Sequence, residues 1–124
     1  MGNKEYENVV AELVSTQSPL AIAILNNNRQ IVKQLLEDSN YDLCGEISPQ
    51  TGDSCIHIAC KNSSDIQILE SLLLKVRSQL QGDKAAITNF LALCNADDMK
   101  ALDYCVFKNR HDMAVVLQEF VDSS

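Results

Sequence analysis

The sequence predicts an all-α fold, a solenoid of stacked helix-turn-helix units joined by short hairpin loops and carrying an extra helical insert. Three short segments align on one another, and pairs of apolar residues at helical spacing follow each of them. Apolar residues make up 46% of the 124-residue chain but aromatic residues only 5%, so the core must consist mainly of small aliphatic side chains. Such a composition suits short helices packed in layers.

We expect one domain made of four parts. Residues 1–16 form an N-terminal capping helix with an apolar face, 17–48 form repeat 1, and 49–94 form repeat 2 with a long second helix and an insert. Residues 95–124 form repeat 3 and a C-terminal cap. One repeat cannot bury its own apolar face, and about three are the minimum for a stable stack. The caps and the insert should therefore be structurally important.

The first repeat begins its first helix with Ser18-Pro19-Leu20-Ala21-Ile22-Ala23, and its second helix carries Ile31, Val32, Leu35 and Leu36 on one stripe. In repeat 2 the corresponding segment is Ser54-Cys55-Ile56-His57-Ile58-Ala59. The apolar period of its second helix runs from Ile66 to Leu80, and Ser64 or Asp65 can cap the start. The apolar stretch within 75–94 then predicts an elongated helix followed by a short extra helix.

The third repeat is the most degenerate and begins with Lys100-Ala101-Leu102-Asp103-Tyr104-Cys105. Its second helix carries Met113, Ala114, Val116 and Leu117, and Phe120 and Val121 can close the end of the stack. Gly45, Pro49 and Gly52 predict turns within 41–53, between the helix pairs of repeats 1 and 2, and residues 94–99 precede the first helix of repeat 3.

The repeat 2 segment resembles the threonine-proline-leucine-histidine-x-alanine signature of ankyrin repeats, and the resemblance covers about residues 17–121. It places Asn27 and Asn109 where the family has a glycine between the helices, and Asn tolerates the left-handed conformation. The resemblance implies projecting hairpins between the helix pairs, one over 41–53 and the other over 94–99. Asp98 replaces the usual glycine of the second hairpin, so we expect that hairpin to be distorted. The resemblance also implies that His57 hydrogen-bonds the backbone and steadies a hairpin.

Members of this family bind proteins through hairpin tips and the concave face of the first helices. Carried over by position, the resemblance implies protein contacts at the hairpin residues Gln50, Thr51, Asp53, Ala96, Asp97 and Met99, and at the helix residues Leu25, Asn26, Lys61, Asn62, Phe107 and Lys108. Leu25 and Phe107 allow two interpretations: each is an exposed anchor in the open groove, or each is buried by irregular packing.

The net charge of −7 disfavours nucleic acid as a partner, because a phosphate backbone attracts basic surfaces. Residues 1–53 carry eight acidic and three basic side chains, so a partner with a basic surface would suit this half. No apolar run approaches the roughly 18 residues of a membrane span. We expect a protein partner, no membrane association and a monomeric state for the free chain.

The five cysteines are an odd number and no signal peptide precedes them, which favours a reducing compartment, the cytoplasm or the nucleus. Cys55, His57 and Cys60 have a spacing that suggests zinc, but the set falls short of the four ligands of a structural zinc site. A Cys/His hydrolase is the enzymatic alternative; no glycine-rich phosphate loop or nucleophile elbow supports catalysis. We therefore expect a non-enzyme without cofactor or metal.

The resemblance thus implies a non-catalytic protein-binding module that acts as an inhibitor or regulator, as in the inhibitor-of-kappa-B class. Two alternatives stay open: a scaffold or adaptor subunit, which needs a second surface such as the 75–94 insert, and a fragment of a larger ankyrin protein. An inhibitor should act alone, whereas an adaptor should hold two proteins.

Overall fold

The computed structural model describes residues 18–63 and 65–123. The capping helix expected over 1–16 and the alternative cap Ser64 lie outside these ranges. Within them the helices are α2 (Pro19–Leu25), α3 (Arg29–Glu37), α4 (Cys55–Asn62), α5 (Ile66–Gln79), α6 (Lys84–Leu91), α7 (Ala101–Phe107) and α8 (His111–Ser123), and there is no β-strand. The predicted all-α class is confirmed.

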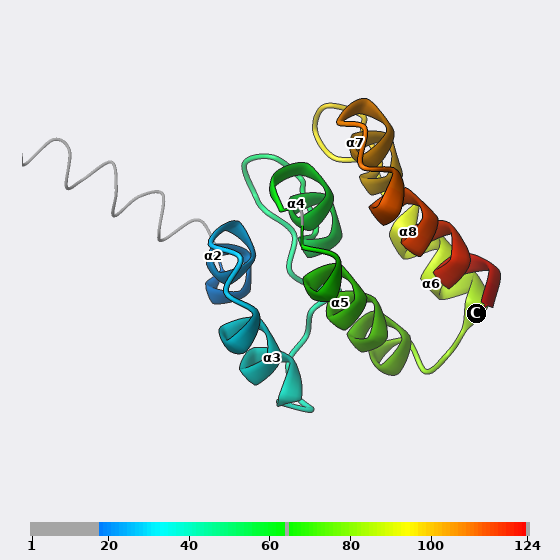
Figure 1. Ribbon diagram of the computed structural model, residues 1–124. Helices are drawn as coiled ribbons and strands as arrows, with labels where there is room; N and C mark the ends of the chain where they lie inside the picture. The colour runs from blue at the N-terminus through cyan, green and yellow to red at the C-terminus, as the bar shows by residue number, and fades with distance from the viewer. Residues whose placement is uncertain (1–17, 64, 124) are drawn as a thin grey trace, which may run out of the picture.

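The helices form two layers (Figure 1). The first helices of the three units, α2, α4 and α7, pack on one another in sequence, and the second helices α3, α5 and α8 do the same. Each first helix also packs on its own second helix. Consecutive helix pairs therefore lie side by side, which is the arrangement that the aligned segments predict.

The core runs continuously through the layers, and aliphatic side chains dominate it. Leu20 of α2, Ile56 of α4 and Leu72 of α5 are each at most 1% exposed. The insert adds α6, which packs on α8 and buries Ile87 and Phe90. The extra helix expected within 75–94 is thus part of the fold rather than a linker.

Polar side chains start the helices. Ser18 Oγ accepts the N–H of Ala21 at 3.0 Å, and Asp65 Oδ1 accepts the N–H of Gln67 at the same distance. The degenerate third repeat has Lys100 in the capping position, and there the Asp103 carboxylate accepts the Lys100 N–H at 2.8 Å. A residue inside the helix thus compensates for the missing cap.

The turns between paired helices follow the sequence prediction. Asn27 has φ 52° and Asn109 has φ 57°, the left-handed conformation that the glycine position requires. Asp98 also adopts it, with φ 60°, and the Asn95 N–H donates to the Met99 carbonyl at 3.0 Å. The expectation of a distorted second hairpin was wrong, because an aspartate can take this conformation as asparagine does.

Side chains of the third repeat cover the exposed carbonyls at the end of α4. Arg110 donates to the carbonyl oxygens of Cys60, at 3.1 Å, and of Ser63. Lys108 Nζ donates to the carbonyl of Lys61 at 2.6 Å. The last carbonyls of a helix have no partner within it and carry partial negative charge. These two cations therefore join successive repeats.

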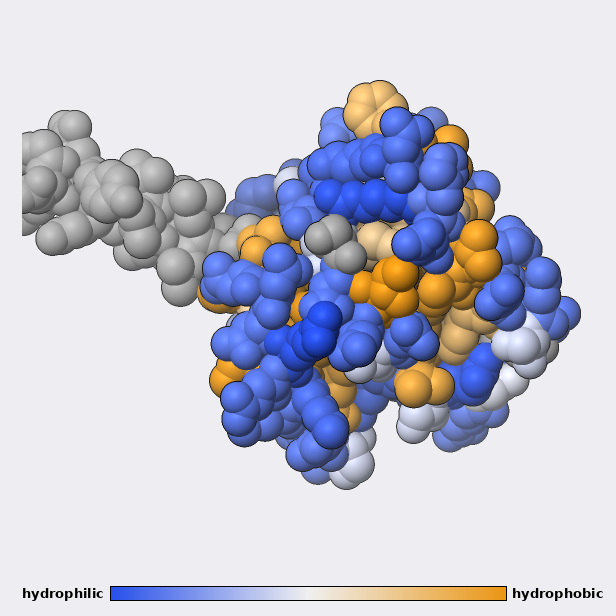
Figure 2. Space-filling model, in the orientation of Figure 1, coloured by the Kyte–Doolittle hydropathy of each residue, from blue (hydrophilic) through white to orange (hydrophobic). Residues whose placement is uncertain are grey.

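The face seen in Figure 2 is polar over much of its area, and apolar atoms gather toward its centre, over α5 and α8. Exposed apolar side chains on these helices include Leu74 and Val115. None of the described helices combines the length and the hydropathy that a membrane span needs.

Candidate functional site

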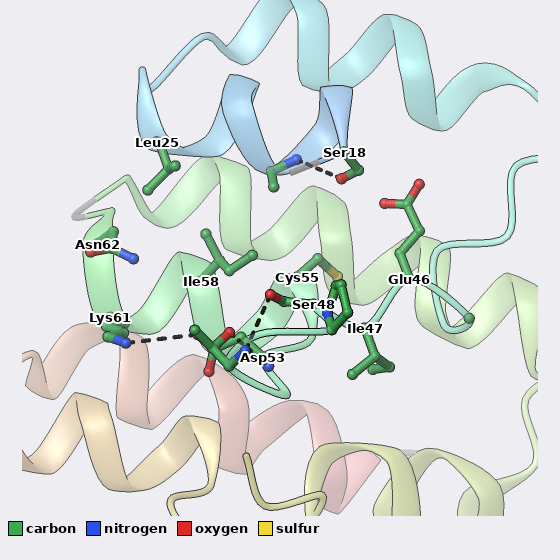
Figure 3. A pocket seen from close by; sticks show the side chains of 14 residues that line it. Ser18, Leu25, Glu46, Ile47, Ser48, Asp53, Cys55, Ile58, Lys61 and Asn62 are labelled. Carbon is green, nitrogen blue, oxygen red and sulfur yellow. Dashed lines mark hydrogen bonds and ion pairs between the residues drawn. The ribbon is translucent and has the colours of Figure 1, made fainter. Parts of the chain in front are cut away.

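A groove of about 350 Å³ lies between α2, α4 and the loop that precedes α4 (Figure 3). Five of the residues expected to contact a partner line it: Leu25, Thr51, Asp53, Lys61 and Asn62. Asn26 and Gln50 are exposed but lie outside the lining. The fold thus brings together the expected contacts of repeat 1, the first hairpin and repeat 2.

The loop is held in place by its own turns and by the next hairpin. The Ser48 N–H donates to the Asp53 carbonyl at 2.9 Å, and the Gly52 N–H donates to the Ser48 carbonyl at 2.8 Å. The Ala96 N–H reaches across to the Thr51 carbonyl at 2.8 Å. Gly52 has φ 72°, and a Cβ there would lie 3.0 Å from the Ala96 nitrogen. Glycine is therefore required where the two hairpins meet.

Aliphatic side chains line the groove. Leu25 is 36% exposed and Ile47 is 42% exposed. Ile58 is half-buried, and Figure 3 shows that it projects from α4 toward α2 while Leu25 projects from α2 toward α4. Ile47 and Ile58 were missing from the sequence prediction. Ile58 lies within the aligned segment, and its apolar character had the plainer interpretation of core packing.

Asp53 does not point outward from a hairpin tip, as the resemblance implied. It is 5% exposed, its Oδ1 accepts from Asn95 Nδ2 at 2.7 Å, and its Oδ2 lies 3.7 Å from Lys61 Nζ. Lys61 Nζ also lies 5.4 Å from the centre of the Tyr104 ring. A buried carboxylate needs such partners, so Asp53 shapes the floor of the groove and its charge is compensated.

Glu46 is the other acidic residue of the groove lining, and the sequence analysis did not identify it. It is half-buried, and its Oε1 accepts from the Tyr41 hydroxyl at 2.6 Å. Burial and the bond to Glu46 both raise the pKa of Tyr41. Tyr41 therefore stays protonated and acts as a neutral donor to a charged carboxylate.

The expected contacts of the third repeat lie outside this groove. Ala96 and Asp97 are exposed, and Phe107 is the most exposed large apolar residue described, at 76%. Lys108 is exposed but already bonded to α4. Met99 was expected at a hairpin tip; it is instead half-buried and packs on the core, because its carbonyl is drawn toward His57. Exposure of both Leu25 and Phe107 excludes the interpretation that irregular packing buries them.

The burial and hydrogen bonds of Cys55, His57 and Cys60 fit a role in packing rather than in metal binding. All three side chains are buried. His57 Nδ1 accepts the Ser54 N–H at 3.0 Å, and Nε2 lies 2.9 Å from the Met99 carbonyl oxygen. Burial raises the pKa of the Cys55 thiol, which disfavours the thiolate that metal binding needs. Across 18–63 and 65–123 no three His, Cys, Asp or Glu side chains are grouped as metal ligands.

Comparison with known proteins gives one match. A family model described as ankyrin repeats, in three copies, matches residues 20–122. No curated protein and no solved structure matches the chain.

Proposed function

Because the chain belongs to the ankyrin-repeat family, we propose that it binds a partner protein in the groove between α2, α4 and the 45–53 loop, as an inhibitor or regulator. Ankyrin repeats form protein-protein interaction modules and are generally non-catalytic. Binding therefore involves no covalent step. We further propose that the free chain is monomeric. We also propose a cytoplasmic or nuclear location, because five free thiols suit a reducing compartment.

The groove is the observation that carries this proposal. Its volume of about 350 Å³ is large enough for one or two side chains of a peptide segment. Leu25 and Ile47 offer apolar surface that water covers in the free protein. Burying one aliphatic partner side chain there contributes on the order of 1.5–3 kcal/mol before the cost of ordering is subtracted.

The charge favours a partner with a basic surface. The chain carries −7 overall, and the groove lining contains Glu46, Asp53 and Lys61, a formal sum of −1. An inhibitor of this kind covers the working surface of its partner and acts by occupying it. Electrostatic attraction would speed the encounter and make binding weaken as salt is added.

An adaptor is the second candidate, and one observation favours it. A smaller groove of about 170 Å³ lies between α6, α7 and α8 and is lined mainly by apolar side chains, among them Leu91, Leu102, Leu117 and Val121. It involves the insert, which is the place where an adaptor would hold a second protein. A regulator that acts alone does not need this groove.

Affinity capture from native cell extract tests the proposal with a matched pair of variants. Leu25→Glu places a charge in the groove, whereas Leu74→Glu makes the same change on α5, where Leu74 is 60% exposed and outside the groove. We expect a specific partner to be captured by the wild type and by Leu74→Glu and lost by Leu25→Glu. Equal capture by both variants would exclude the groove as the binding site.

Leu91→Glu separates the two candidate functions. An inhibitor should keep all captured proteins in this variant. An adaptor should lose one protein and keep another, because only the contact beside α6 is changed.

A further inference from the structure

Among residues 18–63 and 65–123, Glu46 of the groove lining has a hydrogen-bond donor but no ion-pair partner. Asp53 is paired with Lys61 and bonded to Asn95. Glu46 accepts a hydrogen bond from the neutral hydroxyl of Tyr41 and is half-buried beside apolar surface. A carboxylate that is partly removed from water is stabilised when a ligand places a cation beside it.

Glu46 lies toward one end of α2, and the apolar pair Leu25 and Ile58 lies toward the other (Figure 3). Figure 3 shows Glu46 on the side of Ser18, where α2 begins, and Leu25 with Ile58 on the other side, where α2 ends. Ser18 and Leu25 are seven positions apart, and a helix rises about 1.5 Å per residue, so the two ends are separated by about 10 Å.

An extended peptide advances about 3.3 Å per residue. A distance of about 10 Å therefore corresponds to about three residues of an extended segment. Because arginine and lysine side chains are long and flexible, the spacing between the basic and the aliphatic residue of the segment can be about two to four positions.

We propose that the groove selects an extended segment of the partner in which an arginine or lysine pairs with Glu46 and an aliphatic side chain two to four positions away packs on Leu25 and Ile58. This inference rests on the proposed function and adds the chemistry of the recognised segment. The Tyr41 hydroxyl donates to Oε1 of Glu46, so we expect Oε2 to accept from the cation of the ligand.

Selection from a phage-displayed library of random 12-residue peptides on the immobilised full chain tests the inference. Enriched peptides should carry Arg or Lys two to four positions from Leu, Ile or Met. The best peptide is then synthesised, and its Kd is measured by fluorescence polarisation at two salt concentrations. Enrichment of acidic peptides, or of peptides without a basic residue, overturns the inference.

Three variants separate the charge from the fold. Glu46→Gln keeps an acceptor for Tyr41 and removes the charge, and we expect a 3- to 10-fold weaker Kd with a smaller salt dependence. Glu46→Lys should weaken binding by more than 10-fold. Glu70→Lys is the matched control, because Glu70 is exposed on α5 outside the groove, and its Kd should stay within about twofold of wild type.

The outcomes distinguish this inference from the function on which it rests. In one outcome, Leu25→Glu abolishes binding but Glu46→Lys changes the Kd no more than Glu70→Lys does. The groove then remains a protein-binding site, and the charge selectivity is overturned. A selection that enriches no peptide, or only peptides that Leu25→Glu binds as well as wild type, overturns both.

Discussion

His57 Nε2 lies 2.9 Å from the carbonyl oxygen of Met99, 42 residues later in the chain and in the hairpin of the next repeat. Because Nδ1 accepts the Ser54 N–H, the proton of the neutral ring lies on Nε2, which donates to that carbonyl. One side chain thus fixes the start of α4 and the position of the following hairpin. The resemblance implied that His57 hydrogen-bonds the backbone and steadies a hairpin, and its contact with the Met99 carbonyl confirms this role.

Replacing this side chain should destabilise the stack. We expect His57→Ala to lower the free energy of unfolding by about 2–4 kcal/mol, since it leaves the buried Ser54 N–H unpaired, removes one of the two donors to the Met99 carbonyl and opens a cavity. Urea denaturation measures the change. His111→Ala is the control, because His111 is exposed at the start of α8, and it should stay within about 0.5 kcal/mol of wild type. Equal losses in the two variants would contradict the role of His57.

Removing the cation that joins α7–α8 to the end of α4 should also cost stability. Arg110→Ala should lower the free energy of unfolding by about 1.5–3 kcal/mol, because two carbonyls lose a charged donor. Lys108→Ala should cost less than about 1 kcal/mol, because Lys108 is exposed and donates to one carbonyl. Urea midpoints compare the two, and a larger loss for Lys108→Ala would reverse this ranking.

Because Asn109 adopts a left-handed turn, two substitutions there should affect stability differently. Asn109→Gly should leave the protein equally stable or slightly more stable, whereas Asn109→Val should destabilise it by about 1–2 kcal/mol, because a β-branched residue disfavours φ 57°. Thermal unfolding measures both. Asn109 is tested rather than Asn27 because a substitution of Asn27 would also remove the hydrogen bond that its Oδ1 accepts from the Ser63 hydroxyl at 2.7 Å. Equal stability of the Gly and Val variants would show that the turn does not require this conformation.

Two surface variants should separate binding from folding. Leu25→Glu and Phe107→Glu should each change the free energy of unfolding by less than about 1 kcal/mol, because both side chains are exposed at the ends of their helices. Leu25→Glu should weaken partner binding strongly. Phe107→Glu should weaken it less, because Phe107 is a contact that the family resemblance implies but it lies outside the groove lining. Leu72→Glu is the contrasting variant and should unfold the protein, because Leu72 is fully buried. A collapse of folding in either surface variant would place that residue in the core.

Thiol reactivity should follow burial. At pH 8 a disulfide reagent should modify Cys94 rapidly, because it is exposed, and Cys44 slowly, because burial and the nearby Asp42 raise the pKa of Cys44 to about 11. Cys94→Ser should remove the fast phase. Cys44 modified as fast as Cys94 in the native protein would contradict the pKa shift.

The same shift sets the sign of a pH effect on stability. The folded pKa of Cys44 lies above its ordinary value of about 9, so ionisation favours the unfolded chain. Its contribution is fully present below about pH 9 and is lost as the pH rises toward 11. Cys44→Ala should reduce this loss in urea denaturation series at pH 8 and pH 10.

Much of the fold could be predicted from local features. The helix register, the Asp65 cap, the extra helix within 75–94 and the left-handed turns at Asn27 and Asn109 all follow from patterns that span a few residues. Asp98 shows the limit of such reasoning, because its departure from glycine suggested distortion. The turn is held instead by Asn95 Oδ1, which accepts the backbone N–H groups of Asp97 and Met99.

Local patterns in the sequence were enough to identify a stack of helix pairs, because apolar periodicity and turn chemistry are short-range properties that recur in each repeat. Which side chains face the groove depends on the packing of the repeats. Leu25, Glu46 and Ile58 come from three different segments, and Asn95 and Lys61 hold Asp53 away from the hairpin surface. Such placements depend on how the repeats pack on one another, and contacts between distant segments leave no mark in local patterns.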